Sequence, residues 1–303
     1  MERVILHQYA TSPFSEKIRR ILAFKKISWS GVEQPIIAPK PNLTPLTGGY
    51  RKIPVMQIGA DVWCDTAVIA RLLERLRPTP SIFPGGGTGA QEALAHWADH
   101  WLFMATVPPV IAKVLPLLPP GFVEDRQKMS PAFTARNLED AVPHSRSTLL
   151  AALDWLDTQL RGRSFLLGDA FGLADAACFH VLWFLRNDPE SFALVERRSA
   201  LKEWFDRVEA FGPGDFAQID PDEALAIAKK SEPSTTEEDD GSDPNGLRPG
   251  ARVSVVPDDY GTEVVTGTAV VVTSQSIALR RRDGEVGEVV VHFPRAGFRV
   301  TRC

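Results

Sequence analysis

The chain has 303 residues, enough for two or three domains, and its 44% hydrophobic and 24% charged content is typical of a globular protein. Its net charge of −4 argues against a nucleic acid as its partner, because a polyanion is attracted by excess positive charge. No apolar stretch reaches the ~20 residues that a membrane-spanning helix needs, so we expect no membrane partner either.

The first residues run straight into a strand pattern and lack the features of a signal peptide. The three cysteines, Cys64, Cys178 and Cys303, are far apart and form no C-x-x-C pair. Such a set fits a reduced compartment, and Cys64 and Cys178 have the apolar neighbours of packing residues. We therefore expect a cytoplasmic protein.

Residues 1–80 alternate between strand and helix patterns. Strands are expected over 3–9, 28–32, 54–58 and 61–64, and helices over 15–24 and 65–76. The order is strand–helix–strand followed by strand–strand–helix. Because a crossover between strands of one sheet is right-handed, the first two strands should be parallel.

Residues 90–228 form a helical block. Helices are expected over 91–104, 147–160, 173–185 and 201–211. The third of these is apolar nearly all round, which predicts the buried centre of a bundle. The prolines that follow the first helix, Pro108 and Pro109 among them, should prevent one long helix and leave short pieces that line a cleft.

Residues 229–247 are polar, acidic and free of aromatic residues, which is typical of a flexible linker. Residues 248–303 contain short strand patterns separated by turn signals such as Asp283-Gly284. So many strands in so short a segment predict a small closed or half-closed β-barrel.

The most informative segment lies between the first strand and the first helix. Ser12 is a natural N-cap, and Pro13 suits the first helical position, where its missing N–H costs nothing. The Ser12 hydroxyl and the first helical amides thus meet at the carboxyl end of a strand, a place that favours anions. Taken alone, however, the pattern indicates no more than a capped helix start.

Four motifs over residues 1–225 together resemble the cytosolic glutathione transferases. The first is Ser12-Pro13-Phe14, similar to the Ser-Pro-Phe of tau-class and the Cys-Pro-Phe of omega-class members, and the second is Lys52-Ile53-Pro54-Val55, at the family's cis-proline. The third is Asp65-Thr66, similar to the family's Glu-Ser. The fourth is Leu167-Gly168-Asp169 with Gly172-Leu173-Ala174-Asp175, similar to the family's capped central helix. The resemblance implies a thioredoxin-like α/β domain and an all-α domain, to which a small C-terminal β-barrel is added.

The resemblance further implies a homodimeric detoxification enzyme that conjugates glutathione, its co-substrate, to a small apolar electrophile. The thiolate is the nucleophile, and a free thiol has a pKa near ~8.5, so the site must stabilise the anion. The Ser12 hydroxyl and the helix N-terminus can do so, which makes Ser12 the expected catalytic residue. The electrophile is expected to approach from residues 94–125.

Six residues are expected to bind the tripeptide: Phe14, Lys52, Ile53, Pro54, Asp65 and Thr66. A cis Ile53–Pro54 bond would turn the Ile53 backbone outward, where a peptide can pair with it like an added strand. Thr66 would hold a carboxylate and Asp65 the ammonium group. Lys52 would pair with a carboxylate of the same ligand, with Lys40 as a second candidate.

Other interpretations stay open at this stage. The same fold can serve as a glutathione-binding or protein-interaction module without turnover, and the change from Glu-Ser to Asp65-Thr66 favours it. A thiol–disulfide oxidoreductase is disfavoured because position 12 is not cysteine. His96 and His100 have the spacing of metal ligands, but no third ligand is evident, so we expect no metal. Gly172 replaces the family's Ser or Thr, which should weaken the cap of the central helix.

Overall fold

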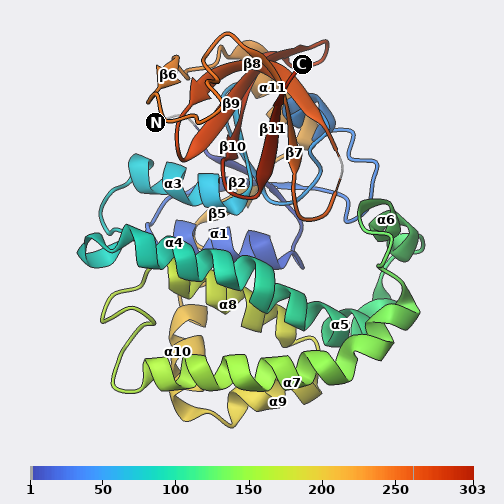
Figure 1. Cartoon of the computed structure of the whole chain (residues 1–303), viewed down its shortest axis with the longest axis vertical. Coiled ribbons are helices and arrows are strands. Elements are labelled where there is room, and N and C mark those ends of the chain that lie inside the picture. The colour runs from blue at the N-terminus through green and yellow to red at the C-terminus, as the bar shows by residue number, and fades with distance from the viewer. Residues whose placement is uncertain (1–2, 262) are drawn as a thin grey trace.

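The protein is described by a computed structural model over residues 3–261 and 263–303. Its parts are stacked, with the helices at the bottom of Figure 1, the α/β domain in the middle and the C-terminal strands at the top. The expected fold, a thioredoxin-like α/β domain and a helical domain with an added C-terminal β domain, is confirmed.

The α/β domain follows the expected order of elements. It consists of β1 (Ile5–Gln8), α1 (Pro13–Phe24), β2 (Trp29–Glu33), α2 (Thr44–Thr47), β3 (Val55–Ile58), β4 (Asp61–Cys64) and α3 (Thr66–Leu76). Strands β1 and β2 are parallel, as predicted, and β3 is antiparallel to β1 and β4. The single turn of α2 was not indicated by the sequence pattern. Cys64 and Cys178 are buried, as expected of packing residues.

The helical domain contains more helices than the apolar periodicity predicts. They are η1 (Pro84–Gly86), α4 (Thr88–Trp97), η2 (Ala98–Leu102), α5 (Phe103–Val114), η3 (Leu115–Leu117), α6 (Phe122–Met129), α7 (Ala135–Leu160), α8 (Leu173–Leu185), α9 (Pro189–Glu196) and α10 (Ser199–Glu209). The prediction that α8 is the buried centre is confirmed, since nearly all of its residues are inaccessible and it packs against α1.

The prediction that prolines break the helix after residue 104 is wrong. Pro108 and Pro109 lie inside α5, which ends only at Val114. An interior proline loses one backbone hydrogen bond and costs about 3 kcal/mol. Here Pro109, Val110 and Ile111 are buried and α5 packs along α7, so the apolar contact outweighs that cost.

The helical run from Thr88 to Leu117 is long and apolar enough to cross a membrane, by length and composition only, contrary to our estimate from the sequence. In this structure Ala98, Leu102 and Val110 of that run belong to the main hydrophobic core. A buried core helix passes the same test of length and composition as a membrane span does.

The cap of α8 is built differently from the expectation. Gly172 offers no side chain, but the Gln91 side chain of α4 takes its place, and its Oε1 accepts the Ala174 N–H at 2.8 Å. Asp175 completes the cap by accepting the Gly172 N–H at 2.9 Å. A Cβ on residue 172 would lie 2.2 Å from the Gln91 Nε2 atom. A side chain at residue 172 would therefore displace Gln91. The expected weakening of the cap is offset from another helix.

The C-terminal strands continue the first sheet instead of forming a separate barrel on a tether. Beyond β5 (Phe216–Gln218) and α11 (Pro221–Lys230) come β6 (Glu238–Asp239), β7 (Arg252–Pro257), β8 (Val265–Val272), β9 (Ser276–Asp283), β10 (Gly287–Pro294) and β11 (Phe298–Arg302). β10 runs parallel to β4, so the order along the sheet is β11-β7-β8-β9-β10-β4-β3-β1-β2-β5. The added domain is thus attached by a strand ladder.

The segment 229–247, which composition marks as a flexible linker, is hydrogen-bonded to the sheet. Ser234 and Thr235 donate to the buried Asp61 carboxylate, at 2.8 and 2.6 Å, and β6 pairs with β8. His292 of β10 also bonds to Asp61, at 3.2 Å. Hydrogen bonds to the sheet therefore hold part of a segment that its composition alone predicts to be flexible.

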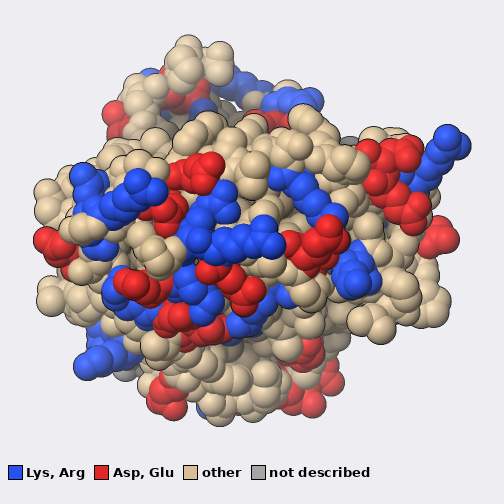
Figure 2. Space-filling model, turned by 90° about the horizontal axis from the view of Figure 1, so that it is seen from below, with Lys and Arg blue, Asp and Glu red and all other residues tan. Residues whose placement is uncertain are grey.

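The two halves of the sheet share one hydrophobic cluster. Leu46, Val55 and Val62 of the α/β domain pack with Val291 and Phe293 of β10. On the outside, basic and acidic side chains intermingle over the face seen in Figure 2, so that face presents no extended surface of one charge.

Candidate active site

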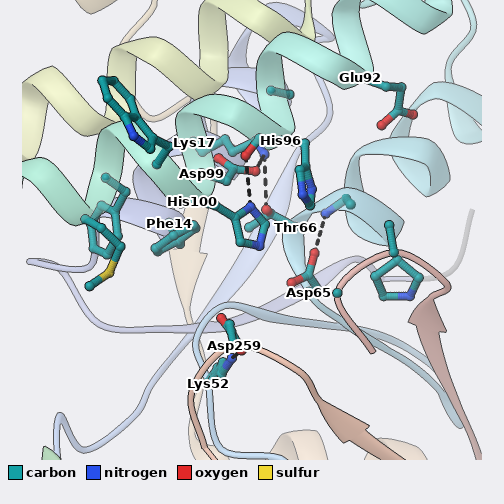
Figure 3. Close-up of a pocket in the computed structure, with 18 of the residues that line it drawn as sticks. Phe14, Lys17, Lys52, Asp65, Thr66, Glu92, His96, Asp99, His100 and Asp259 are labelled. Carbon is teal, nitrogen blue, oxygen red and sulfur yellow. Dashed lines mark hydrogen bonds and ion pairs between the residues drawn. The ribbon is translucent and has the colours of Figure 1, made fainter. Parts of the chain in front are cut away.

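A cavity of about 1260 Å³ lies between the α/β domain, helices α4 and α5 and the loops of the added β domain. Its walls include all six residues that the sequence analysis assigned to the tripeptide: Phe14, Lys52, Ile53, Pro54, Asp65 and Thr66. Figure 3 shows Asp65 and Thr66 near its centre and Lys52 farther along, beside Asp259. The residues of three separate motifs therefore meet in one place.

Ser12 is the N-cap of α1, as the sequence predicts. Its Oγ accepts the Ser15 N–H at 3.2 Å. The residue is only 1% exposed and does not line the cavity, although Phe14 and Lys17 of the same helix do. Burial raises the pKa of the neighbouring Tyr9 phenol, so Tyr9 stays protonated. The first turn of α1 thus faces the cavity with Ser12 behind its wall.

The Ile53–Pro54 peptide bond is cis, as the resemblance implies. Within the described part of the chain, no backbone hydrogen bond involves the Ile53 N–H or C=O. Ile53 is half-buried on the cavity wall, and its backbone N–H and C=O are strong hydrogen-bonding groups that a ligand there could pair with. An extended peptide could pair with them.

Asp65 and Thr66 begin α3 at the cavity wall. Asp65 has a φ of 92°, which is uncommon for a residue with a side chain, and its Oδ1 accepts the Ala67 N–H at 2.8 Å. Burial raises the pKa of Asp65, and the Ala67 amide offsets this only in part. The backbone strain and the buried carboxylate are both features that cluster at functional sites.

Behind Thr66 lies a chain of polar groups that the sequence analysis missed. The Lys17 ammonium donates to Thr66 Oγ1 at 3.1 Å and pairs with Asp99 Oδ2 at 2.5 Å, and Asp99 Oδ1 bonds to His180 Nε2 at 2.9 Å. Burial alone would raise the pKa of Asp99, but Lys17 and His180 hold it well below its usual range. The sequence does contain one signal for these polar groups, because Lys17, a charged residue, stands next to Ile18 in the apolar stripe of α1.

Lys52 is already paired with the added β domain. Its Nζ lies 2.5 Å from Asp259 Oδ1 and 4.0 Å from the centroid of the Tyr260 ring. Both partners follow β7 and line the cavity. Their presence could not be inferred from the sequence, because nothing in residues 248–303 indicates which end of the sheet they join.

The helical side of the cavity is of mixed polarity. Phe103 and Met104 are apolar, whereas His96, His100 and the Arg71–Glu92 ion pair, at 2.8 Å, are polar. The rings of His96 and His100 lie 4.0 Å apart, and the described residues include no cluster of three metal-ligating side chains. This wall could take a ligand with an aromatic part and a hydrogen-bonding group.

Comparison with family models matches residues 6–81 to the N-terminal domain and residues 139–207 to the C-terminal domain of glutathione S-transferase. These segments contain the cavity residues Ile53, Pro54, Asp65 and Thr66 and the helix α8. Each match agrees with one of the two domains described above.

A solved structure of a GST-like protein from Pseudomonas syringae is 36% identical, with a TM-score of 0.84 over 100% of both chains. Among curated proteins, glutathione S-transferase TCHQD of Arabidopsis thaliana is 23% identical over 65% of this chain and 88% of its own length. A protein named ribosomal protein L11 methyltransferase, from Methylococcus capsulatus, is 28% identical over 64% of this chain and 66% of its own length. The likeness to the Pseudomonas syringae structure includes the C-terminal strands.

Proposed function

Because the chain belongs to the glutathione S-transferase family, we propose that it binds glutathione and conjugates it to a small apolar electrophile. The thiol loses its proton, and the thiolate forms a thioether bond to the electrophilic carbon. The observation that carries the proposal is the cis Ile53–Pro54 bond on the same wall as Asp65 and Thr66, with an Ile53 N–H and C=O that have no hydrogen-bond partner among the described residues. No metal is needed for the reaction. The cell compartment is proposed to be the cytoplasm.

In the proposed complex the tripeptide lies along the wall from Asp65 to Lys52. Asp65 pairs with the γ-glutamyl ammonium, and Thr66 with the first amides of α3 holds the adjacent carboxylate. The cysteinyl unit pairs with the Ile53 backbone. Lys17, which donates to Thr66 Oγ1, adds positive charge beneath the carboxylate.

Ser12 is proposed to donate a hydrogen bond to the glutathione sulfur, as in a serine-type, tau-like transferase. Its Oγ accepts from the Ser15 N–H, so its own proton stays available for an anion. The N-terminus of α1 adds a partial positive charge at the same point. Since Ser12 lies behind the cavity wall, the bound thiol has to displace part of that wall to reach it.

The test is Ser12→Ala, measured by conjugation of 1-chloro-2,4-dinitrobenzene as a function of pH. We expect kcat/KM at pH 7 to fall about tenfold to a hundredfold, with a raised kinetic pKa of the bound thiol, because one donor to the anion is lost. The exposed neighbour Thr11 provides the control, since Thr11→Ala should leave both quantities unchanged. Full activity of Ser12→Ala with an unchanged pH profile contradicts the role.

A second function, a binding module without turnover, is favoured by one observation: Lys52 is engaged by Asp259 and Tyr260. Isothermal titration with glutathione followed by conjugation assays on a panel of electrophiles separates the two. Binding without turnover across the panel supports the module.

We also propose a homodimer. Trp101 and Trp155, whose rings stack with centroids 6.0 Å apart, are 44% and 58% exposed, which is unusual for large apolar residues in a monomer. Light scattering coupled to size exclusion measures the mass and decides between one chain and two.

A further inference from the structure

A short segment of the added β domain, residues 258–261, crosses one end of the cavity. At its start the Asp258 N–H donates to Gly297 O at 3.0 Å, within the added domain. At its end the Gly261 N–H donates to Met129 O at 3.1 Å, at the end of α6 in the helical domain. The segment is therefore held at both ends, and its middle faces the α/β domain.

The middle of this segment delivers a carboxylate to Lys52. Asp259 Oδ1 lies 2.5 Å from Lys52 Nζ, and the Tyr260 ring covers the ammonium with its centroid at 4.0 Å. A cation held against an aromatic face and a carboxylate has its charge satisfied by the protein. The side chains of Lys52 and Asp259 are 15% and 30% exposed, so the pair stays in partial contact with solvent at the cavity wall.

The other basic residues near this end are also occupied. Arg51 pairs with Asp125, at 2.5 Å, and lies 3.7 Å from Glu263. Arg126 pairs with the same Asp125. Lys40 is buried and donates to Pro35 O, and it does not line the cavity. Of these four cations only Lys52 lines the cavity, so a ligand carboxylate that arrives here meets a cation that already has a carboxylate partner.

The proposed function determines where the glycyl end of glutathione lies. With the γ-glutamyl group at Asp65 and Thr66 and the cysteinyl unit at Ile53, the remaining carboxylate, that of the glycyl residue, falls at Lys52. Figure 3 shows this spacing, with Lys52 and Asp259 together and apart from Asp65 and Thr66. Asp259 stands where the glycyl carboxylate would bind.

We propose that Asp259 is a specificity-determining residue that selects γ-glutamyl thiols whose far end is uncharged. A free glycyl carboxylate competes with Asp259 for one ammonium group, and like charges at such distances repel. A ligand that ends in an ester or amide leaves the Lys52–Asp259 pair intact. This inference rests on the proposed function, since it uses the same placement of the tripeptide.

The test compares two ligands that differ only in that charge: glutathione and its glycyl monoethyl ester. Titration calorimetry is carried out on the wild-type chain, Asp259→Asn and the matched control Asp258→Asn. Asp258 is an exposed acid on the same segment whose side chain makes no hydrogen bond among the described residues.

In the wild type we expect the ester to bind about tenfold more tightly than glutathione, the effect of one close like charge at the protein surface. Asp259→Asn should raise the affinity for glutathione about tenfold and change that for the ester less than about twofold. Asp258→Asn should leave the ratio of the two affinities as it is. Added salt should reduce the wild-type preference, because it screens the repulsion.

Three results overturn the inference, and they show whether the proposed function fails with it. If the wild type binds glutathione more tightly than the ester, or if Asp259→Asn changes both affinities equally, Asp259 does not discriminate between a charged and an uncharged glycyl end. The proposed function then still stands. If neither ligand binds to any of the three proteins, the proposed function fails and the inference with it. The salt series on the wild type gives the same decision without a variant.

Discussion

The cap of α8 offers a sharp test of how the structure compensates for a missing side chain. Gln91 reaches from α4 to accept the Ala174 N–H, in the space that a side chain at Gly172 would fill. Gln91→Ala and Gly172→Ser should therefore each destabilise the protein. The double variant should recover part of the loss, because the new serine can cap the helix once the glutamine is gone.

The magnitudes follow from the contacts. Gln91→Ala leaves the Ala174 N–H buried without a partner, which costs about 2 kcal/mol of unfolding free energy. In Gly172→Ser the new Cβ lies 2.2 Å from Gln91 Nε2, so the glutamine must move and the same bond is lost, again about 2 kcal/mol. Residue 172 has φ −135° and ψ 179°, which serine adopts without strain. The double variant should thus be more stable than the sum of the singles predicts, by about 2 kcal/mol.

Urea unfolding followed by circular dichroism measures all four free energies. Gly87→Ser is the control, because Gly87 caps the neighbouring helix α4 and a Cβ there meets nothing closer than 3.7 Å. It should be neutral. If the losses of the two single variants add in the double variant within ~0.5 kcal/mol, Gln91 is not a substitute for the cap and the argument is refuted.

Two further predictions concern the sheet. Burial lowers the pKa of His7 to about 4, so between pH 6.5 and about 4 the unfolded chain binds a proton that the folded chain does not. The unfolding free energy should therefore fall by about 3 kcal/mol as the pH is lowered over that range. Urea titrations of His7→Gln should show a correspondingly smaller fall. Ending the chain at residue 231 should abolish cooperative unfolding and cause aggregation, because β4 loses β10 and the buried Asp61 loses Ser234, Thr235 and His292. A monodisperse, cooperatively unfolding fragment would show instead that the added domain is dispensable.

The local elements of the α/β domain could be predicted because their signals are local. The capped start of α1 at Pro13 and the short strands around the Gly59-Ala60 turn all lie where the residue pattern indicates. The wall of the cavity was also predictable, since Ile53–Pro54 and Asp65-Thr66 are motifs that the chain itself spells out.

The features that could not be predicted from the sequence depend on contacts between segments that are distant along the chain. The acidic composition of 229–247 predicts a flexible linker, but the bonds of Ser234 and Thr235 to Asp61 and the pairing of β6 with β8 hold part of it in place. The interior prolines of α5 are tolerated because of α7, which lies elsewhere in the chain. The pairing of Lys52 with Asp259 depends on which edge of the α/β sheet the added strands pair with, and no local sequence pattern indicates that edge.

The attachment of the added domain and the composition of the cavity have one cause. Without β10, strand β4 would be an edge strand with unpaired backbone groups, a site at which sheets aggregate. Covering this edge with β10 fixes the rest of the domain beside the cavity, because β4 leads directly into Asp65 at the start of α3. The segment after β7 is then close enough to reach Lys52, and the loops at Gln275 and Gly297 add to the same wall. A strand ladder that closes an edge therefore also decides which charges a ligand meets.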